Sequence, residues 1–309
     1  MTPSRLPAVT VSVLVWNGER HLDALLTAAL NQDYAGRVEV LVIDSGSTDR
    51  SLEIVAAHPT VRLHQIPNSQ FGHGRTRNLA AQLAKGEIVA YLTHDAVPVG
   101  RGWLANLVAP MLDDERIVAV VGKQIPRPAS APVIKYDIRR VFQRLGPDYG
   151  TTVVWDTGFF IAEEMRVAAC FYSDANSAAR RSILTGPVPY RDVAYAEDQF
   201  FGRDLFDQGY RKAYAPLAAV EHSNDLGLRE SGRRIVDEVL GLRRIGVAIP
   251  PMSALTALLK AVKWSLIDVA SILADKDYGF WRSLGWLFAN PLHQVVKWFS
   301  FRRGSRLPV

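Results

Sequence analysis

The sequence predicts an α/β fold, in which a mostly parallel sheet is flanked by helices and followed by a helical C-terminal tail. In the first half of the chain, short aliphatic or β-branched runs alternate with segments of helical apolar spacing. Repetition of this kind is typical of a parallel sheet covered on both faces. The chain has 309 residues, of which 48% are hydrophobic and 22% are charged. Such a composition is ordinary for a globular protein with a sizeable core.

The elements follow one another in a regular order. We expect strands at 9–15, 38–43, 61–65, 88–92 and 117–121. We expect helices between them at 19–30, 48–57, 74–84 and 103–112. After a Pro-rich linker, the spacing predicts further helices at 135–145, 176–183 and 198–208. We place a catalytic domain at 1–225 and a helical C-terminal region at 226–309.

Several classes of protein are disfavoured by missing features. The single cysteine, Cys170, forbids an internal disulfide and fits a reducing compartment. The apolar stretch at 9–16 is too short to span a bilayer and has no cleavage site, so we expect a cytoplasmic protein. Neither a Gly-x-Gly-x-x-Gly after the first strand nor a P-loop occurs, which disfavours dinucleotide enzymes and P-loop nucleotidases.

The tail differs from the body in charge. Residues 252–309 hold eight Lys and Arg against three Asp and Glu, a net charge of +5, while the rest of the chain sums to zero. Four of the seven tryptophans also lie there. A neutral body with a basic, Trp-rich tail argues against nucleic acid and for an anionic membrane surface. No uncharged run approaches the roughly 20 residues of a spanning helix. The alternative is that these helices pack on the catalytic domain or form a dimer interface.

Carboxylates follow two of the predicted strands. Ligands on such sheets lie beyond the carboxyl ends of the strands. Asp44 ends the second run, where it is suited to accept a hydrogen bond from the imide of a uracil or thymine ring. Asp95 follows the fourth run, where a divalent cation and a nucleotide diphosphate are expected. An imidazole from a distant segment, His222, would complete the shell of that cation and favour Mn²⁺. A satisfied loop histidine is the alternative for His222.

A second pair of acids opens the helix predicted at 198–208. Glu197 and Asp198 stand in its first turn, where the helix dipole alone favours negative charge. The functional interpretation is a general base at the floor of a pocket, which deprotonates an acceptor hydroxyl.

Four ordered segments, at 11–19, 44–49, 74–95 and 196–209, together resemble the GT-A glycosyltransferases of family 2, over roughly residues 8–225. The resemblance implies an inverting transferase in which Asp44 binds the nucleobase, Asp95 holds Mg²⁺ or Mn²⁺, with His222 as a second ligand, and Asp198 is the catalytic base. The chain departs from the family's Asp-x-Asp motif, because Thr93 replaces the first acid.

A narrower resemblance is to bacterial rhamnosyltransferases, in the segments 68–78, 92–96 and 172–181. It implies transfer of L-rhamnose from dTDP-L-rhamnose to a saccharide or lipid-linked saccharide in cell-surface polysaccharide assembly. Arg75 and Arg77 together suit a diphosphate. The resemblance implies a donor site made of Trp16, Asn17, Glu19, Asp44, Arg75, Arg77, Asn78, Thr93, His94, Asn176 and Glu197.

Three alternatives remain open. The donor could be a UDP-hexose, or the chain could be a catalytically inactive sugar-nucleotide-binding module. A nucleotidyltransferase would share the fold but is expected to carry a basic, Gly-rich N-terminal loop, which 11–20 lacks. The expected partners are the donor, the acceptor and an anionic membrane surface near the inner face of the cell membrane, with a homo-oligomer left open and no nucleic acid.

Overall fold

The computed structural model describes residues 5–158, 163–223 and 226–308. The chain forms two compact units, one made of Met1–Ile125 and Phe142–His222 and the other of Pro126–Val141 and Ser223–Val309. The second unit thus includes a segment that precedes the predicted tail. The domain boundary near residue 225 stays a prediction.

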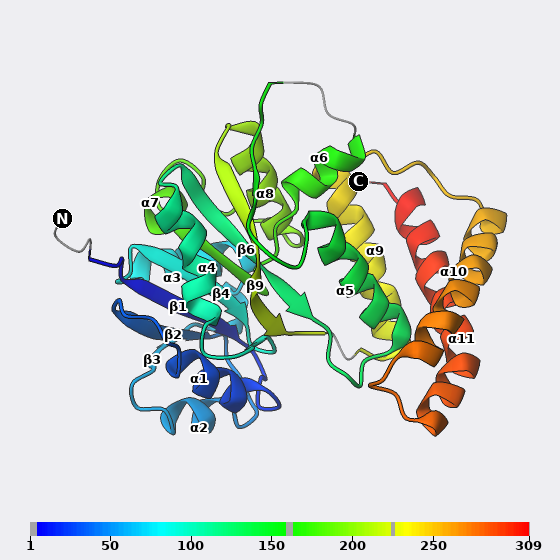
Figure 1. The fold of residues 1–309 in the computed structure, drawn as a ribbon, viewed down its shortest axis with the longest axis horizontal. Coiled ribbons are helices and arrows are strands. Elements are labelled where there is room, and N and C mark those ends of the chain that lie inside the picture. The colour runs from blue at the N-terminus through cyan, green and yellow to red at the C-terminus, as the bar shows by residue number, and fades with distance from the viewer. Residues whose placement is uncertain (1–4, 159–162, 224–225, 309) are drawn as a thin grey trace. The chain divides into compact units, whose positions relative to one another are not determined.

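The first unit alternates strands and helices (Figure 1). Its described strands are β1 Val9–Val15, β2 Val38–Asp44, β3 Arg62–Gln65, β4 Ile88–Thr93, β5 Val97–Pro98, β6 Ile117–Ile125, β7 Thr152–Val154, β8 Asn176–Arg180 and β9 Arg211–Glu221. Its described helices are α1 Leu22–Leu30, α2 Ser51–Ala56, the short 3₁₀ helix η1 Asn68–Gln70, α3 His73–Leu83, α4 Trp103–Asp113, α6 Glu163–Cys170, α7 Arg181–Leu184 and α8 Glu197–Asp207. Helix α5, Pro132–Leu145, has residues in both units.

The described strands form one sheet in the order β3-β2-β1-β4-β8-β6-β9-β5, with β7 paired to β9. Strands β3, β2, β1 and β4 are parallel, as the repeating pattern predicts. Every residue of β1 is buried, which is expected of a parallel strand covered on both faces. The other half is mixed, because β8 runs antiparallel to both β4 and β6.

The helix predicted at 176–183 is wrong. Residues Asn176–Arg180 form strand β8, and only the four residues after it are helical. The small residues Ser177, Ala178 and Ala179 are buried in the middle of the sheet, where larger side chains would have less room. Tertiary packing therefore outweighs the helix propensity of alanine and arginine.

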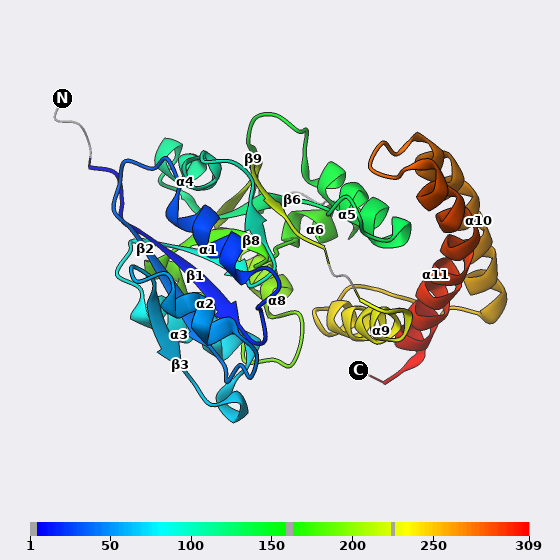
Figure 2. The same cartoon turned by 90° about the horizontal axis from the view of Figure 1, so that it is seen from below.

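The second unit contains α9 Leu228–Arg244, α10 Ala254–Ala274 and α11 Phe280–Arg306. Helix α11 lies beside both α9 and α10 (Figure 2). It runs through Pro291 without a break. Pro291 is exposed, so its ring points away from the neighbouring helices. Among the described helices, none combines the length and hydropathy needed to cross a membrane.

Candidate active site

The carboxyl ends of three parallel strands meet at one edge of the sheet. Val15 of β1 pairs with Asp44 of β2, and Leu14 pairs with Thr93 of β4. The loops that follow these strands are therefore neighbours. The His94 side chain also packs closely against Gly18. There is no room for a larger residue at this position, since a Cβ atom built on Gly18 would lie only 3.1 Å from His94 Cβ. Residues predicted separately as donor contacts are thus gathered at this edge.

The loops after β1 and β2 hold each other by reciprocal hydrogen bonds. The Asn17 side-chain oxygen accepts the Thr48 N–H at 2.8 Å, and Glu19 Oε2 accepts the Arg50 N–H at 3.1 Å. Asn17 adopts a left-handed φ of 51°, which asparagine tolerates better than most residues. Asn17 and Glu19 therefore shape the loop. The Trp16 side chain is 55% exposed and is available for a ligand.

The Asp44 carboxylate is 1% exposed at the end of β2. Its Oδ2 accepts the N–H groups of Gly46 at 3.0 Å and Ser47 at 3.2 Å. The side chain thus fixes the turn that follows the strand. Carboxylate oxygens carry spare lone pairs, so the proposed contact with a nucleobase stays a prediction.

Asp95 and His222 meet although they come from distant segments. His222 Nε2 lies 3.4 Å from Asp95 Oδ2. The sheet brings them together, because β9 ends beside β5 and Glu221 pairs with Val97. Burial alone would raise the pKa of Asp95, but the hydrogen bond and charge of His222 outweigh it, so this pKa lies well below its usual range. The site therefore favours a carboxylate anion.

A hydrogen-bonded chain orients the His222 ring. Gln124 Nε2 donates to Ser173 Oγ at 2.9 Å, which leaves Gln124 Oε1 to accept from His222 Nδ1 at 2.8 Å. Nε2 therefore faces the Asp95 carboxylate, where it either shares a proton with that carboxylate or, in neutral His222, offers its lone pair. A cation between the two groups would take the place of that proton, and an orienting partner on the other ring nitrogen is typical of metal-ligating histidines.

The donor set therefore fits a divalent cation of the Mg²⁺ or Mn²⁺ class. Within the described residues, no group of three or more His, Cys, Asp or Glu side chains could hold a metal. Two protein ligands are nevertheless enough for a cation whose remaining positions are taken by phosphate oxygens and water.

Arg77 lies in a buried charge network. Its guanidinium pairs with Asp174 at 2.8 Å and with Glu197 at 2.6 Å, and all three side chains are at most 8% exposed. Asp174 also accepts hydrogen bonds from Tyr190 and Ser177, both at 2.7 Å. The Arg77 and Glu197 side chains therefore bind each other inside the protein, and their predicted contact with the donor stays a prediction.

Asp198 follows Glu197 in the first turn of α8. Burial raises the pKa of Asp198 well above its usual range, and the carboxylates of Glu197 and Asp174 raise it further. Ala196, just before the helix, has a left-handed φ of 65°, which is costly for a residue with a Cβ atom. A strained backbone thus presents a carboxylate of raised basicity, as general-base catalysis requires.

Three other predicted donor contacts have different surroundings. Asn176 is fully buried: its amide donates to the carbonyls of Lys123 and Ala218, and its oxygen accepts from Trp103 Nε1. Asn78 is bound to both backbone groups of Tyr190. Asn176 and Asn78 thus have structural partners, and their predicted contacts with the donor stay predictions. Arg75 pairs with Asp192 at the surface and remains accessible.

Sequence reasoning missed Gln124, Ser173 and Asp174 as parts of the site. Asp174 and Ser173 lie in the segment 172–181 that carries the narrower resemblance, so a signal was present. Gln124 lies in the last part of β6, beyond the predicted strand, and its pattern carries no signal. Cys170 is buried, and this burial raises the pKa of its thiol.

Comparisons with known proteins identify the family. The model of the family described as "Glycosyl transferase family 2" matches residues 10–184. The chain is 29% identical over 218 residues to the O-antigen chain rhamnosyltransferase RfbN of Salmonella typhimurium, covering 70% of this chain and 65% of the relative. It is 30% identical to WbaN of Salmonella anatum, also an O-antigen chain rhamnosyltransferase, covering 64% and 61%. The matches thus span less than two thirds of either relative.

The solved structures show the same architecture. A mannosyltransferase from Pyrobaculum calidifontis, PcManGT, solved in complex with GDP-Man and Mn²⁺, superposes with a TM-score of 0.59 at 22% identity, covering 96% of this chain and 88% of that one. At this identity the similarity defines the fold. The chain has a GT-A fold and belongs to glycosyltransferase family 2.

Proposed function

We propose that the protein is an inverting glycosyltransferase that moves L-rhamnose from dTDP-L-rhamnose to a saccharide or lipid-linked saccharide in cell-surface polysaccharide assembly. Family membership and the two rhamnosyltransferase relatives support this class. The observation that carries the proposal is the Asp95–His222 pair, because it joins a carboxylate and an imidazole from distant segments beside the donor edge.

Asp95 and His222 would hold Mg²⁺ or Mn²⁺. When bound, the cation would neutralise charge on the diphosphate leaving group, where most negative charge develops. PcManGT, which shares the fold, was solved with Mn²⁺. Gln124 and Ser173 would act as positioning residues, since they fix the His222 ring.

Asp198 is proposed as the general base. The acceptor hydroxyl gives its proton to the Asp198 carboxylate while its oxygen attacks the anomeric carbon. The bond between that carbon and the diphosphate oxygen breaks on the opposite face, which inverts the configuration. The raised pKa of Asp198 favours this proton transfer. Arg77 and Glu197 support the base, because Arg77 offsets part of the negative charge around it.

The donor is proposed to lie along the edge formed by the loops after β1, β2 and β4. Trp16 offers an exposed aromatic face, and Arg75 offers a guanidinium at the surface. Thr93 and His94 lie at the carboxyl end of β4, next to the cation ligand Asp95. Asp44 would accept a hydrogen bond from the nucleobase. Asn17 and Glu19 act by holding the loops in place.

We place the catalytic domain at residues 1–225 and the protein at the inner face of the cell membrane, where a lipid-linked acceptor would be held. The net charge of +5 in residues 252–309 supports this location.

A panel of nucleotide sugars tests the donor. Binding is measured as a thermal shift of the full chain with Mn²⁺ and with EDTA, because a ligand that binds the folded protein raises its melting temperature more when the ratio of ligand concentration to Kd is larger. The expected result is that dTDP-L-rhamnose stabilises more than UDP-glucose. Equal or greater stabilisation by UDP-glucose would overturn the rhamnose donor. Binding without any donor turnover would instead indicate an inactive sugar-nucleotide-binding module.

A further inference from the structure

Helix α10 turns its large apolar residues outward. Six of them recur at intervals of three or four positions and so share one helix face. These are Leu255, Leu259, Val262, Leu266, Val269 and Leu273, whose exposed fractions lie between 38% and 68%. A helix that packs on a protein core by its apolar face would show the opposite arrangement.

Helix α11 repeats this arrangement. Its outward residues also recur at intervals of three or four and include two aromatic side chains, Trp281 and Phe288, that are each 79% exposed. The full set is Trp281, Leu284, Phe288, Leu292, Val295 and Phe299, and Phe280 is exposed beside it. We call the outward residues of the two helices the apolar face.

The side chains between α10 and α11 are smaller and more polar than those on the outward sides of the two helices. Asp268 is fully buried and accepts hydrogen bonds from Asn290 at 3.1 Å and from Gln294 at 2.6 Å. Ala257 and Ala261 are buried on the same side of α10 and pack with Trp298. The helix pair is therefore inverted, with small and polar side chains inside and leucine and aromatic side chains outside.

An exposed surface of this size marks an interaction site, because apolar side chains in water lose the free energy that burial would supply. The charges beside it indicate the kind of partner. The acids of this region are paired within the unit: Asp268 lies 3.5 Å from Arg140, and Asp275 and Asp277 pair with Lys135 at 2.9 Å and 2.8 Å. Lys263 and Lys276 are exposed.

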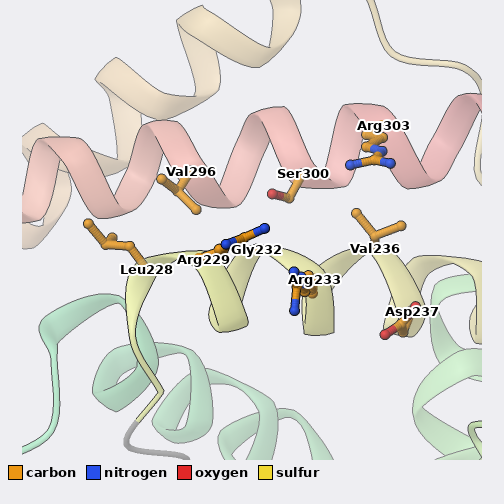
Figure 3. Close-up of a pocket in the computed structure, with 9 residues that line it drawn as sticks. All are labelled: Leu228, Arg229, Gly232, Arg233, Val236, Asp237, Val296, Ser300 and Arg303. Carbon is orange, nitrogen blue, oxygen red and sulfur yellow. The ribbon is translucent and has the colours of Figure 1, made fainter.

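A basic groove lies beside the apolar face on α11. It is formed between α9 and α11, encloses about 660 Å³ and is lined by three arginines and one aspartate (Figure 3). The arginines are Arg229 and Arg233 of α9 and Arg303 of α11. Arg303 follows Phe299 by four positions, so the groove adjoins the apolar face on α11. Guanidinium groups in such a groove suit phosphate.

We propose that the apolar face docks on an anionic phospholipid bilayer, with its side chains at the boundary between headgroups and acyl chains and the basic groove on lipid phosphates. Exposed aromatic and aliphatic residues next to cations are what an interfacial helix uses. A second copy of the chain fits less well, because two copies of the same face would bring like charges together.

The test is vesicle co-sedimentation of the full chain. Two vesicle compositions are compared, one of phosphatidylcholine alone and one with phosphatidylglycerol in equal parts. We expect at least about tenfold tighter binding to the anionic vesicles, weakened by added salt. The triple variant L259S/L266S/F288S removes three apolar contacts, and each change is expected to weaken binding by about tenfold. All three side chains are exposed, so the fold should be kept.

A matched variant, L217S/M165S, changes two exposed apolar residues outside α10 and α11 and should bind vesicles like the wild type. R233Q/R303Q should weaken binding to anionic vesicles and leave binding to neutral ones unchanged. Vesicle binding that survives in the triple variant would overturn the proposal. A wild type that ignores vesicles but forms a dimer, which the triple variant breaks in analytical ultracentrifugation, would overturn it too. Donor binding in the thermal-shift panel is independent of these outcomes.

Discussion

The buried charge network around Arg77 predicts a large effect on stability. Arg77→Met keeps most of the volume of the side chain but leaves Asp174 and Glu197 without their cation. Breaking a buried pair in this way typically costs about 3–5 kcal/mol, because an uncompensated charge remains inside the protein. We expect the free energy of unfolding, measured by urea denaturation at pH 7, to fall by about this amount.

The loss should depend on pH. Burial raises the pKa of both Asp174 and Asp198, and the charge of Glu197 raises these pKa values further, while the charge of Arg77 lowers both. Removing Arg77 therefore moves both folded-state pKa values further above their unfolded values. A carboxyl group whose pKa is higher in the folded protein than in the unfolded chain lowers the free energy of unfolding as the pH rises toward the folded-state pKa. The difference from wild type should thus be larger at pH 8 than at pH 5.

Two further variants make this prediction sharp. Arg77→Lys keeps the charge but not the forked geometry, so it should cost less than Arg77→Met. Arg77→Met combined with Glu197→Gln removes one orphaned charge and should recover part of the stability. The reasoning would be refuted if Arg77→Met lowered the free energy of unfolding by less than about 1 kcal/mol and strongly weakened dTDP binding. That result would indicate that Arg77 binds the diphosphate.

Three other changes separate chemistry from structure. Asp198→Asn should lower the rate of sugar transfer by about 10²–10⁴-fold and leave the donor affinity near that of the wild type. It should also raise the melting temperature at pH 8, because it removes a buried negative charge. Substantial remaining transfer would show that another residue is the base. Gln124→Leu frees the His222 ring, so Mn²⁺ affinity measured by electron paramagnetic resonance should fall about 10–100-fold, and an unchanged affinity would contradict the orienting role. Asn176→Ala should destabilise by about 1–3 kcal/mol without changing donor affinity, whereas weaker donor binding at unchanged stability would restore its predicted role.

The parallel half of the sheet could be predicted because its strands are buried on both faces. Such strands appear in the sequence as continuous aliphatic runs, and β1, β2 and β4 have this pattern. The positions of Asp44 and Asp95 follow directly, since each stands at or just beyond a strand's carboxyl end. Local pattern was sufficient for these parts of the site.

Strand β8 could not be predicted in the same way. Asn176–Arg180 contains small and polar residues that occur equally well in helices. Its burial depends on the neighbours β4 and β6, which are distant in the sequence. The same limit applies to the Asn176 side chain, whose three partners are contributed by other segments.

Long-range pairs explain the partners that the sequence did not predict. Arg77 was expected at the diphosphate because a guanidinium near a Gly-rich loop suits phosphate, but its partner Asp174 is supplied by a distant segment. No local pattern predicts the hydrogen bond between Gln124 and His222. Charge and periodicity in α10 and α11 did predict helices with a basic character, whereas the inverted packing around Asp268 required the structure.

The central claim is that Asp95 and His222 hold a divalent cation that binds the donor diphosphate. Calorimetric titration of dTDP tests it most directly, with Mn²⁺ and with excess EDTA, on the wild type, His222→Ala and a control, His58→Ala. His58 pairs with Asp23, away from the donor edge. We expect EDTA to weaken dTDP binding at least about tenfold in the wild type and the control, and to have little further effect in His222→Ala. A wild-type affinity that is the same with Mn²⁺ and with EDTA would contradict the claim.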